Sequence, residues 1–147
     1  MSLLPWQTQA AAKVEALLAA ERLPHALLIR APEGWGEVHF ADWLAHRLLE
    51  LPPPSFDANF PDNESAEDGE LNVVGRTLAH GDLRWVEPDG AVIKVDDIRV
   101  LAEFAIGTRQ SAPRKVAVIE RAHLLNPSAA NALLKTLEEP PPHTHLL

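Results

Sequence analysis

Hydrophobic residues recur every three or four positions in four stretches of the sequence, which is the spacing of amphipathic helices. The first stretch, Gln7–Glu21, is rich in Ala and Leu, and Pro24 follows it. The apolar positions at this spacing are Trp6, just before the stretch, and Ala10, Val14, Leu17 and Leu18 within it. The second stretch has Phe40, Trp43, Leu44 and Leu48 on one face, and the prolines at 52–54 end it. The first half of the chain therefore predicts two helices.

Two further helices are predicted in the second half of the chain. Asp96 is placed to cap the third helix, whose apolar face carries Ile98, Leu101, Ala105 and Ile106. The fourth begins at Asn126-Pro127, because Asn accepts hydrogen bonds from free backbone N–H groups and Pro lacks the N–H that would go unused. Its apolar face carries Ala130, Leu133, Leu134 and Leu137, and the prolines at 140–142 end it.

Short apolar runs between these helices predict β-strands. His25–Arg30 and Lys115–Glu120 are continuously apolar in their middle, as expected of strands that are buried on both faces. Leu83–Val86 and Val92–Val95 flank a Pro-Asp-Gly turn, and Thr144–Leu147 predicts the start of another strand. Strands that alternate with helices predict an α/β domain with a mainly parallel sheet, whose ligands bind at the C-terminal ends of the strands.

Composition narrows the class of protein. A chain of 147 residues with 46% hydrophobic and 23% charged residues is typical of one soluble globular domain. It has no apolar run near the roughly 18 residues of a membrane span and no basic secretion signal, so we expect a cytoplasmic protein. The absence of cysteine excludes disulfides, thiol catalysis and thiolate-bound zinc. The net charge of −8 opposes unaided binding to nucleic acid, because that affinity comes mostly from basic side chains.

The segment between residues 51 and 75 differs from the rest of the chain. It contains six of the acidic residues and no basic residue. We interpret it as an exposed insertion that is solvated and flexible. An acidic interaction patch is the alternative interpretation.

A glycine-containing turn between the strand His25–Arg30 and the second helix has the setting of a phosphate-binding loop, G-x-x-x-x-G-K-[ST]. The window reads Ala31-Pro32-Glu33-Gly34-Trp35-Gly36-Glu37-Val38. Gly36 is kept, but Ala31 replaces the first glycine, Glu37 stands at the lysine position and Val38 at the magnesium-binding hydroxyl. Two like charges 4 Å apart repel by about 4 kcal/mol at an effective dielectric constant near 20, so tight ATP binding is not expected. A plain strand-to-helix turn without any phosphate role is the alternative.

The end of the second buried strand gives an independent criterion. A phosphate-loop ATPase carries there one acid that holds magnesium and usually a second that activates water. The corresponding residues are Glu120 and Arg121, and an arginine cannot act as the base. We predict no ATP hydrolysis, no catalytic residue and no bound cofactor. We also expect no metal site, because His143 and His145 have strand spacing but lack a third ligand.

Three stretches of sequence resemble the clamp-loader branch of the AAA+ proteins: Leu23–Leu28, Val118–Asn126 and, most specifically, Asn131–Pro141. The resemblance covers Leu4 to Leu147 apart from the acidic insertion. It implies a P-loop NTPase-like parallel sheet flanked by helices. Together with the altered phosphate loop, it implies a non-hydrolysing subunit that acts as a rigid arm in a five-membered ring. The implied partners are ATPase motor subunits, a delta-type subunit and, through the assembly, the sliding clamp and primed DNA, with no membrane.

The sequence departs from this family in two respects. Many members carry a four-cysteine zinc module where this chain has the acidic insertion, so we expect no zinc. In the family's sheet, the strand after the Glu-Glu-Pro-Pro motif lies between those matching His25–Arg30 and Lys115–Glu120. A chain that ends at Leu147 is then an AAA+ domain, 1–147, whose sheet is incomplete. We therefore expect that the chain is an N-terminal piece of a longer protein, and that it folds poorly alone or fills the gap in its sheet by pairing with another copy. The resemblance also implies an arginine that reaches into the ATP site of a neighbouring subunit, and this arginine lies beyond Leu147.

Two other functions stay open at this point. A divergent ATPase would use Gly36 and Glu120 in an unusual way. A DNA-binding module would use Lys135 and Arg121 as part of a basic surface formed with neighbouring subunits.

Overall fold

The computed structural model describes residues 3–52 and 80–147. In chain order its elements are η1 (Pro5–Gln7), α1 (Thr8–Ala19), α2 (Glu37–Leu48), β1 (Leu83–Val86), α3 (Val95–Ile106), β2 (Lys115–Ile119), η2 (Ala122–Leu124), α4 (Pro127–Glu138) and β3 (Thr144–Leu146). The four predicted α-helices are confirmed. Nearly all of the predicted acidic insertion lies outside the described residues. Within the described ranges, no helix is long and apolar enough to cross a membrane.

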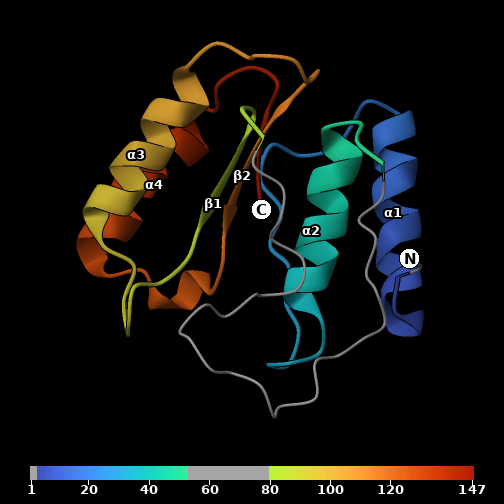
Figure 1. Ribbon diagram of the computed structural model, residues 1–147, viewed down its shortest axis with the longest axis horizontal. Helices are drawn as coiled ribbons and strands as arrows, with labels where there is room; N and C mark the ends of the chain where they lie inside the picture. The colour runs from blue at the N-terminus through green and yellow to red at the C-terminus, as the bar shows by residue number, and fades with distance from the viewer. Residues whose placement is uncertain (1–2, 53–79) are drawn as a thin grey trace, which may run out of the picture.

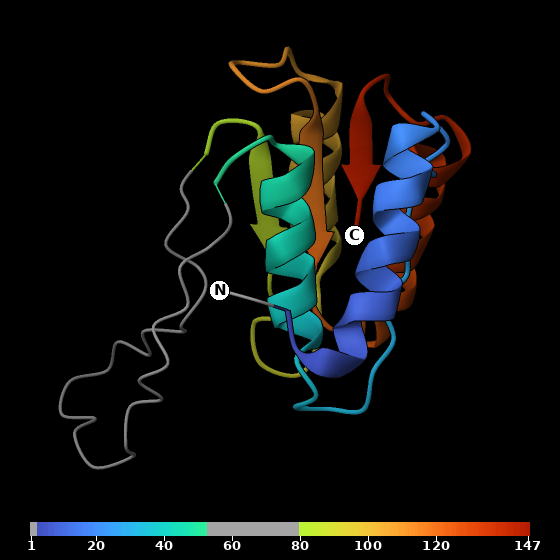
Figure 2. The same ribbon diagram turned by 90° about the vertical axis from the view of Figure 1, so that its right-hand side faces the viewer.

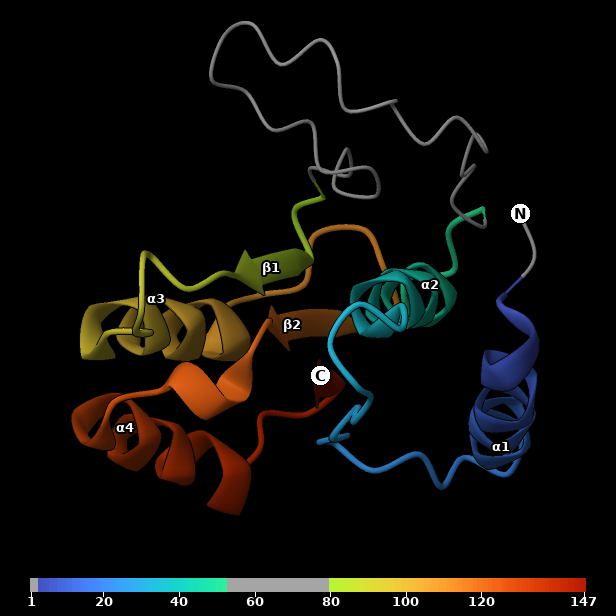
Figure 3. The same ribbon diagram turned by 90° about the horizontal axis from the view of Figure 1, so that it is seen from below.

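The three strands form a parallel sheet in the order β1-β2-β3 (Figure 1). Leu83 pairs with Val116 in the β1–β2 register, and Lys115 pairs with Thr144 in the β2–β3 register. Helices α3 and α4 cover one face of this sheet, and α1 and α2 lie on the other side (Figure 3). The predicted α/β fold with a parallel sheet flanked by helices is therefore confirmed.

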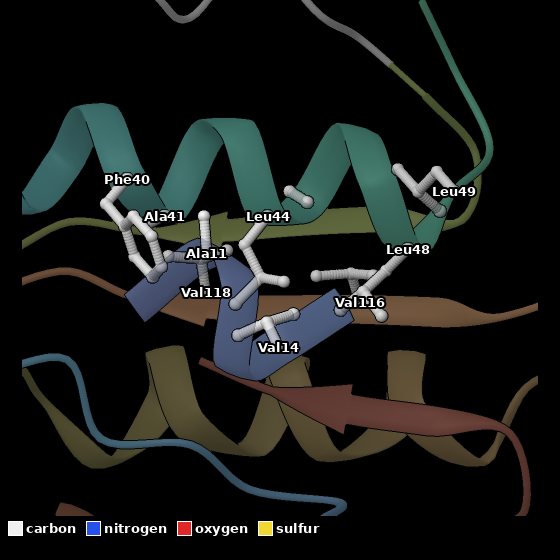
Figure 4. Close-up of a cluster of buried hydrophobic side chains, with 10 residues drawn as sticks. Ala11, Val14, Phe40, Ala41, Leu44, Leu48, Leu49, Val116 and Val118 are labelled. Atoms are coloured by element: carbon white, nitrogen blue, oxygen red, sulfur yellow. The ribbon is translucent and has the colours of Figure 1, made fainter. Parts of the chain in front are cut away.

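Strand β2 is the centre of the core, because all five of its residues are buried. Alternate side chains point to opposite faces of a strand. Val116 and Val118 accordingly pack with α1 and α2 (Figure 4), whereas Ala117 and Ile119 pack with α3 and α4. The largest fully buried apolar side chains around them are Leu44, Leu48, Ile93, Ile98 and Leu101.

The prediction of a buried strand at His25–Arg30 is wrong in its extent. Only Ala26 forms a bridge, to Leu146, with hydrogen bonds from Leu27 N to Leu146 O and from Leu146 N to His25 O. Among the described residues no strand lies beside residues 28–30, and Leu28 is 77% exposed. The predicted order is nevertheless confirmed, since β3 lies between this segment and β2.

The predicted strand Val92–Val95 is also wrong. Ile93 forms a single bridge to Leu125, and α3 begins at Val95, which leaves no room for a strand. Asp96 does not cap this helix either. The N-cap is Lys94, whose N–H donates to Asp97 Oδ2 (3.3 Å), while Asp96 pairs with Arg99 at 3.2 Å.

The predicted apolar faces of the helices are partly wrong. In α1 the buried residues are Ala11 and Val14, and in α4 they are Ala129 and Leu133. The side chains predicted to be buried that are exposed are Trp6, Ala10, Ile106, Ala130 and Leu134. A helical repeat fixes the spacing of a buried face, but the neighbouring elements decide where that face begins.

Asp82, just before β1, is a buried carboxylate that the sequence analysis did not single out. Its two oxygens accept hydrogen bonds from the backbone N–H groups of Gln110 (2.7 Å), Ser111 (2.8 Å) and Ala112 (2.8 Å). Burial by itself would raise the pKa of Asp82, but the three backbone donors outweigh burial and lower it. Asp82 thereby fixes the connection between α3 and β2.

Candidate functional site

The turn before α2 lies at the end of the molecule toward which β1 and β2 point (Figure 2). Gly34 and Gly36 have φ angles of +81° and +90°, in the left-handed region that favours glycine. A Cβ atom on Gly36 would lie only 2.7 Å from Leu4 Cδ1 and 2.9 Å from Gln7 Nε2. Gly36 is therefore required by both its backbone conformation and its surroundings.

Residues of the segment that precedes α1 form hydrogen bonds and a ring contact with this turn. The Trp6 indole Nε1–H donates to the Trp35 carbonyl (3.0 Å), and the Gln7 amide donates to the Gly36 carbonyl (2.8 Å). The Trp6 and Trp35 rings lie 5.9 Å apart between centroids. Sequence reasoning missed these contacts, which join segments 29 residues apart. The one feature of the sequence that could have indicated these contacts is Gln7, a polar residue at the start of an Ala-rich helix.

Glu37 and Val38 form the first turn of α2 and line a cavity of about 950 Å³. Ala31 lines the same cavity. The Glu37 Oε2 atom is buried and accepts no hydrogen bond from any described residue. A buried carboxylate oxygen without a donor is unfavourable and calls for an explanation.

Glu120 and Arg121 follow β2 and line this cavity as well. Glu120 Oε2 accepts a hydrogen bond from the Trp85 indole Nε1–H (3.0 Å). Arg121, with a φ of +55°, places its Nη2 atom 3.2 Å from Glu33 Oε1 in the turn. The structure thus brings the residues singled out in the loop and at the strand end to one place, across 88 residues of sequence.

The cavity is lined by both charged and apolar side chains. Its charged residues are the carboxylates of Glu33, Glu37 and Glu120 and two arginines, Arg30 and Arg121, of which Arg121 is paired with Glu33; a nucleotide's phosphates need cationic donors. The first turn of α2 carries neither a lysine nor a hydroxyl side chain. The apolar residues that line the cavity include Leu27, Ile29, Ala41, Val118, Ile119, Leu133, Leu137, Leu146 and Leu147.

His143 and His145, which the sequence analysis considered as metal ligands, do not line this cavity. The His145 Nδ1–H donates to the Pro24 carbonyl (3.0 Å), and burial lowers the pKa of His145. His143 precedes β3 with a φ of +56°, so the two side chains do not share the predicted strand geometry. No group of three potential ligands occurs within residues 3–52 and 80–147.

Comparison with known proteins shows which family this arrangement belongs to. Residues 6–147 match the family described as DNA polymerase III, delta subunit. The chain belongs to this family. The resemblance to clamp-loader proteins stated from the sequence is thereby confirmed.

Individual relatives agree with the family match. The chain is 38% identical to the DNA polymerase III subunit delta' of Pseudomonas aeruginosa, over 84% of this chain and 36% of that protein. It is 31% identical to the delta' subunit of Buchnera aphidicola, over 96% of this chain and 41% of the relative. It is also 32% identical to the gamma/tau subunit of Mycobacterium tuberculosis, over 93% of this chain and 23% of that protein. The chain thus spans about two fifths or less of each relative's length.

A solved structure supports the fold. The crystal structure of a DNA polymerase III gamma subunit-related protein from Thermotoga maritima superposes with a TM-score of 0.65 at 21% identity. The match covers 90% of this chain and 37% of that one. At this identity the likeness bears on the fold and not on the activity.

Proposed function

We propose that this chain forms part of a clamp-loader subunit of the delta-prime type, which works through protein contacts and does not hydrolyse ATP. In this proposal it acts in the cytoplasm as a rigid arm beside ATPase motor subunits and a delta-type subunit. Through that assembly it helps to load the sliding clamp on primed DNA. The observation that carries the proposal is Glu37, which stands at the lysine position with a buried, unpartnered oxygen.

The physical argument concerns the charges that a triphosphate would meet. A phosphate oxygen about 4 Å from Glu37 would be repelled by about 4 kcal/mol at an effective dielectric constant near 20. Val38 offers no oxygen to magnesium, and Arg121 supplies no base for the attacking water. Three separate requirements for ATP hydrolysis are therefore unmet at this site.

An ATPase is the second candidate function, because a gamma/tau subunit is among the relatives at 32% identity. Titration with a fluorescent ATP analogue and magnesium separates the two functions, with circular dichroism as the check on folding. We expect no binding up to about millimolar nucleotide, which corresponds to a binding free energy weaker than about −4 kcal/mol. Micromolar binding by the unaltered chain would favour the ATPase.

A double variant tests whether the loop is an altered phosphate site. Glu37→Lys with Val38→Thr restores the lysine and the hydroxyl, so we expect it to gain measurable nucleotide binding. The Glu37→Gln variant is the control, because it removes the negative charge without supplying a cation. If the double variant binds no better than Glu37→Gln, the plain strand-to-helix turn is the better interpretation.

A further inference from the structure

Residues 4–7, which we call the strap, are held in one conformation by local contacts. Pro5 begins η1, and its ring fixes the φ angle there. The Gln7 N–H donates to the Leu4 carbonyl (2.8 Å), and the Gln7 Oε1 atom accepts the Leu4 N–H (3.2 Å). The Thr8 hydroxyl donates to the Pro5 carbonyl (2.7 Å). The strap is therefore a rigid element against which another segment can be fixed.

Gln7 connects the strap to the turn before α2 through a buried amide. Gln7 is 6% exposed, and its Nε2 atom donates to the Gly36 carbonyl (2.8 Å) while its Oε1 atom accepts from Leu4. The Trp6 indole Nε1–H adds a second hydrogen bond, to the Trp35 carbonyl (3.0 Å). Breaking either bond of the Gln7 side chain would leave a buried polar group without a partner, so this connection resists opening.

The turn at residues 31–36 has few contacts of its own. Among the described residues, the one backbone hydrogen bond within it runs from the Trp35 N–H to the Pro32 carbonyl (3.1 Å). The ion pair between Glu33 and Arg121 is exposed on both sides, and exposed ion pairs contribute little to stability. The conformation of the turn therefore depends mainly on the strap.

We propose that the strap locks this turn in one conformation in the absence of nucleotide. In a phosphate-binding loop, the phosphates of the nucleotide bind the backbone N–H groups of the loop. Here the strap binds the backbone carbonyls of Trp35 and Gly36 instead, so two peptide groups of the turn are fixed through their oxygens. A subunit that serves as a rigid arm thereby gains a turn whose shape does not change with the nucleotide state of its neighbours.

NMR order parameters of the backbone N–H groups in the whole 147-residue chain test this lock. The reporters are Gly34, Trp35 and Gly36, and the reference is strand β2. The Gln7→Met variant keeps the length of the side chain but removes both of its hydrogen bonds. We expect the reporters to fall from about 0.85, the value of rigid backbone, to below about 0.6 in this variant, while β2 stays near 0.85.

Two more variants make the result specific. Trp6→Phe keeps an aromatic ring at an exposed position and removes the indole donor, so it leaves the core untouched. We expect it to lower the order parameter of Trp35 by a smaller amount than Gln7→Met does. Gln9→Met makes the same substitution at an exposed position of α1 and should leave the turn unchanged. A turn that stays rigid in both Gln7→Met and Trp6→Phe, or that is already mobile in the unaltered chain, would overturn the proposal.

Addition of nucleotide tests whether the lock is complete. Magnesium-ATP at millimolar concentration should leave the order parameters of the unaltered chain unchanged, because the strap already fixes the turn. If the order parameters of Gly34, Trp35 and Gly36 rose on addition of ATP, the nucleotide and not the strap would order the turn, and the proposal would be wrong.

This inference rests on the proposed function, since it assumes a turn that works without nucleotide. The two proposals fail in different ways. Micromolar ATP binding would refute the non-hydrolysing subunit, whereas a turn that stays rigid in both strap variants, without ATP binding, would refute only the lock.

Discussion

The carboxylate of Asp82 gives the sharpest test of how the structure is stabilised. Asp82 is fully buried, and it accepts three backbone hydrogen bonds from residues 110–112. The Asp82→Asn substitution keeps the size of the side chain, but it replaces one acceptor oxygen by an NH₂ group. That group would point at backbone N–H donors, so at least one donor would lose its partner.

The magnitude follows from these contacts. A hydrogen bond to a charged group contributes about 1.5–3 kcal/mol, and a buried donor without a partner costs about 1–3 kcal/mol. The three bonds form one network and their contributions do not add, so we expect a loss of about 3 kcal/mol in the free energy of unfolding. That loss is a large part of the roughly 5–15 kcal/mol that stabilises a typical domain.

Urea unfolding followed by circular dichroism measures this loss. The control is Asp89→Asn, which makes the same change at an exposed turn residue and should shift the free energy of unfolding by less than about 0.5 kcal/mol. A loss below about 1 kcal/mol for Asp82→Asn would refute the account of the three bonds.

The pH dependence supplies a second, independent check. The pKa of Asp82 is lower in the folded chain than in the unfolded chain, where an aspartate has a pKa of about 3.9. The stabilisation is therefore complete above about pH 4 and is lost as the pH falls through the lower folded-state value. The difference between the original chain and Asp82→Asn should narrow below about pH 4, and a constant difference would contradict the assignment.

Three other predictions concern the turn, a helix cap and a histidine. Gly36→Ala should lower the free energy of unfolding by more than Gly34→Ala. Both residues have positive φ, but only Gly36 lies against other side chains, so we expect a loss of about 1 kcal/mol for Gly34→Ala and a larger loss for Gly36→Ala. Asn126→Ala should cost about 1 kcal/mol by removing the cap of α4, while Asn126→Ser should restore most of it in the same urea assay. The pKa of His145 is lowered by burial, so the unfolded chain takes up its proton first and the stability of the original chain should fall from about pH 6.5 downward. The fall between pH 7 and pH 5 should be smaller in the His145→Asn variant, although some of it remains because burial also lowers the pKa of His39. An identical fall in thermal melts of both proteins would contradict the prediction.

Local sequence signals were sufficient for the helices and for the central strand. Asn126 accepts the Ala129 N–H at 2.8 Å, as the Asn-Pro pair predicted. Strand β2 is buried throughout, as its apolar run predicted. Both features depend on hydrogen bonds and side chains within a few residues, so a single stretch of sequence carries the information.

Part of the candidate site could also be predicted from the sequence. The sequence identified the turn and the strand end separately, together with the rule that sites lie at the C-terminal ends of parallel strands. The contact between Arg121 and Glu33 agrees with that rule. The unpartnered oxygen of Glu37 was not predictable, because it depends on how deeply the first turn of α2 is packed.

The sequence by itself determined the class of fold and the family, and it placed Glu37, Val38 and Arg121 at the positions compared with those of a phosphate-loop ATPase. Only the tertiary structure decided which apolar run becomes a strand, where the buried face of each helix begins, and which donors reach Asp82. The physical reason is that a strand needs a neighbour along its length, and a buried carboxylate needs donors that the chain supplies from far away in sequence. Residues 92–95 pair only through isolated bridges, whereas Asp82 finds its donors 28 to 30 residues further along the chain.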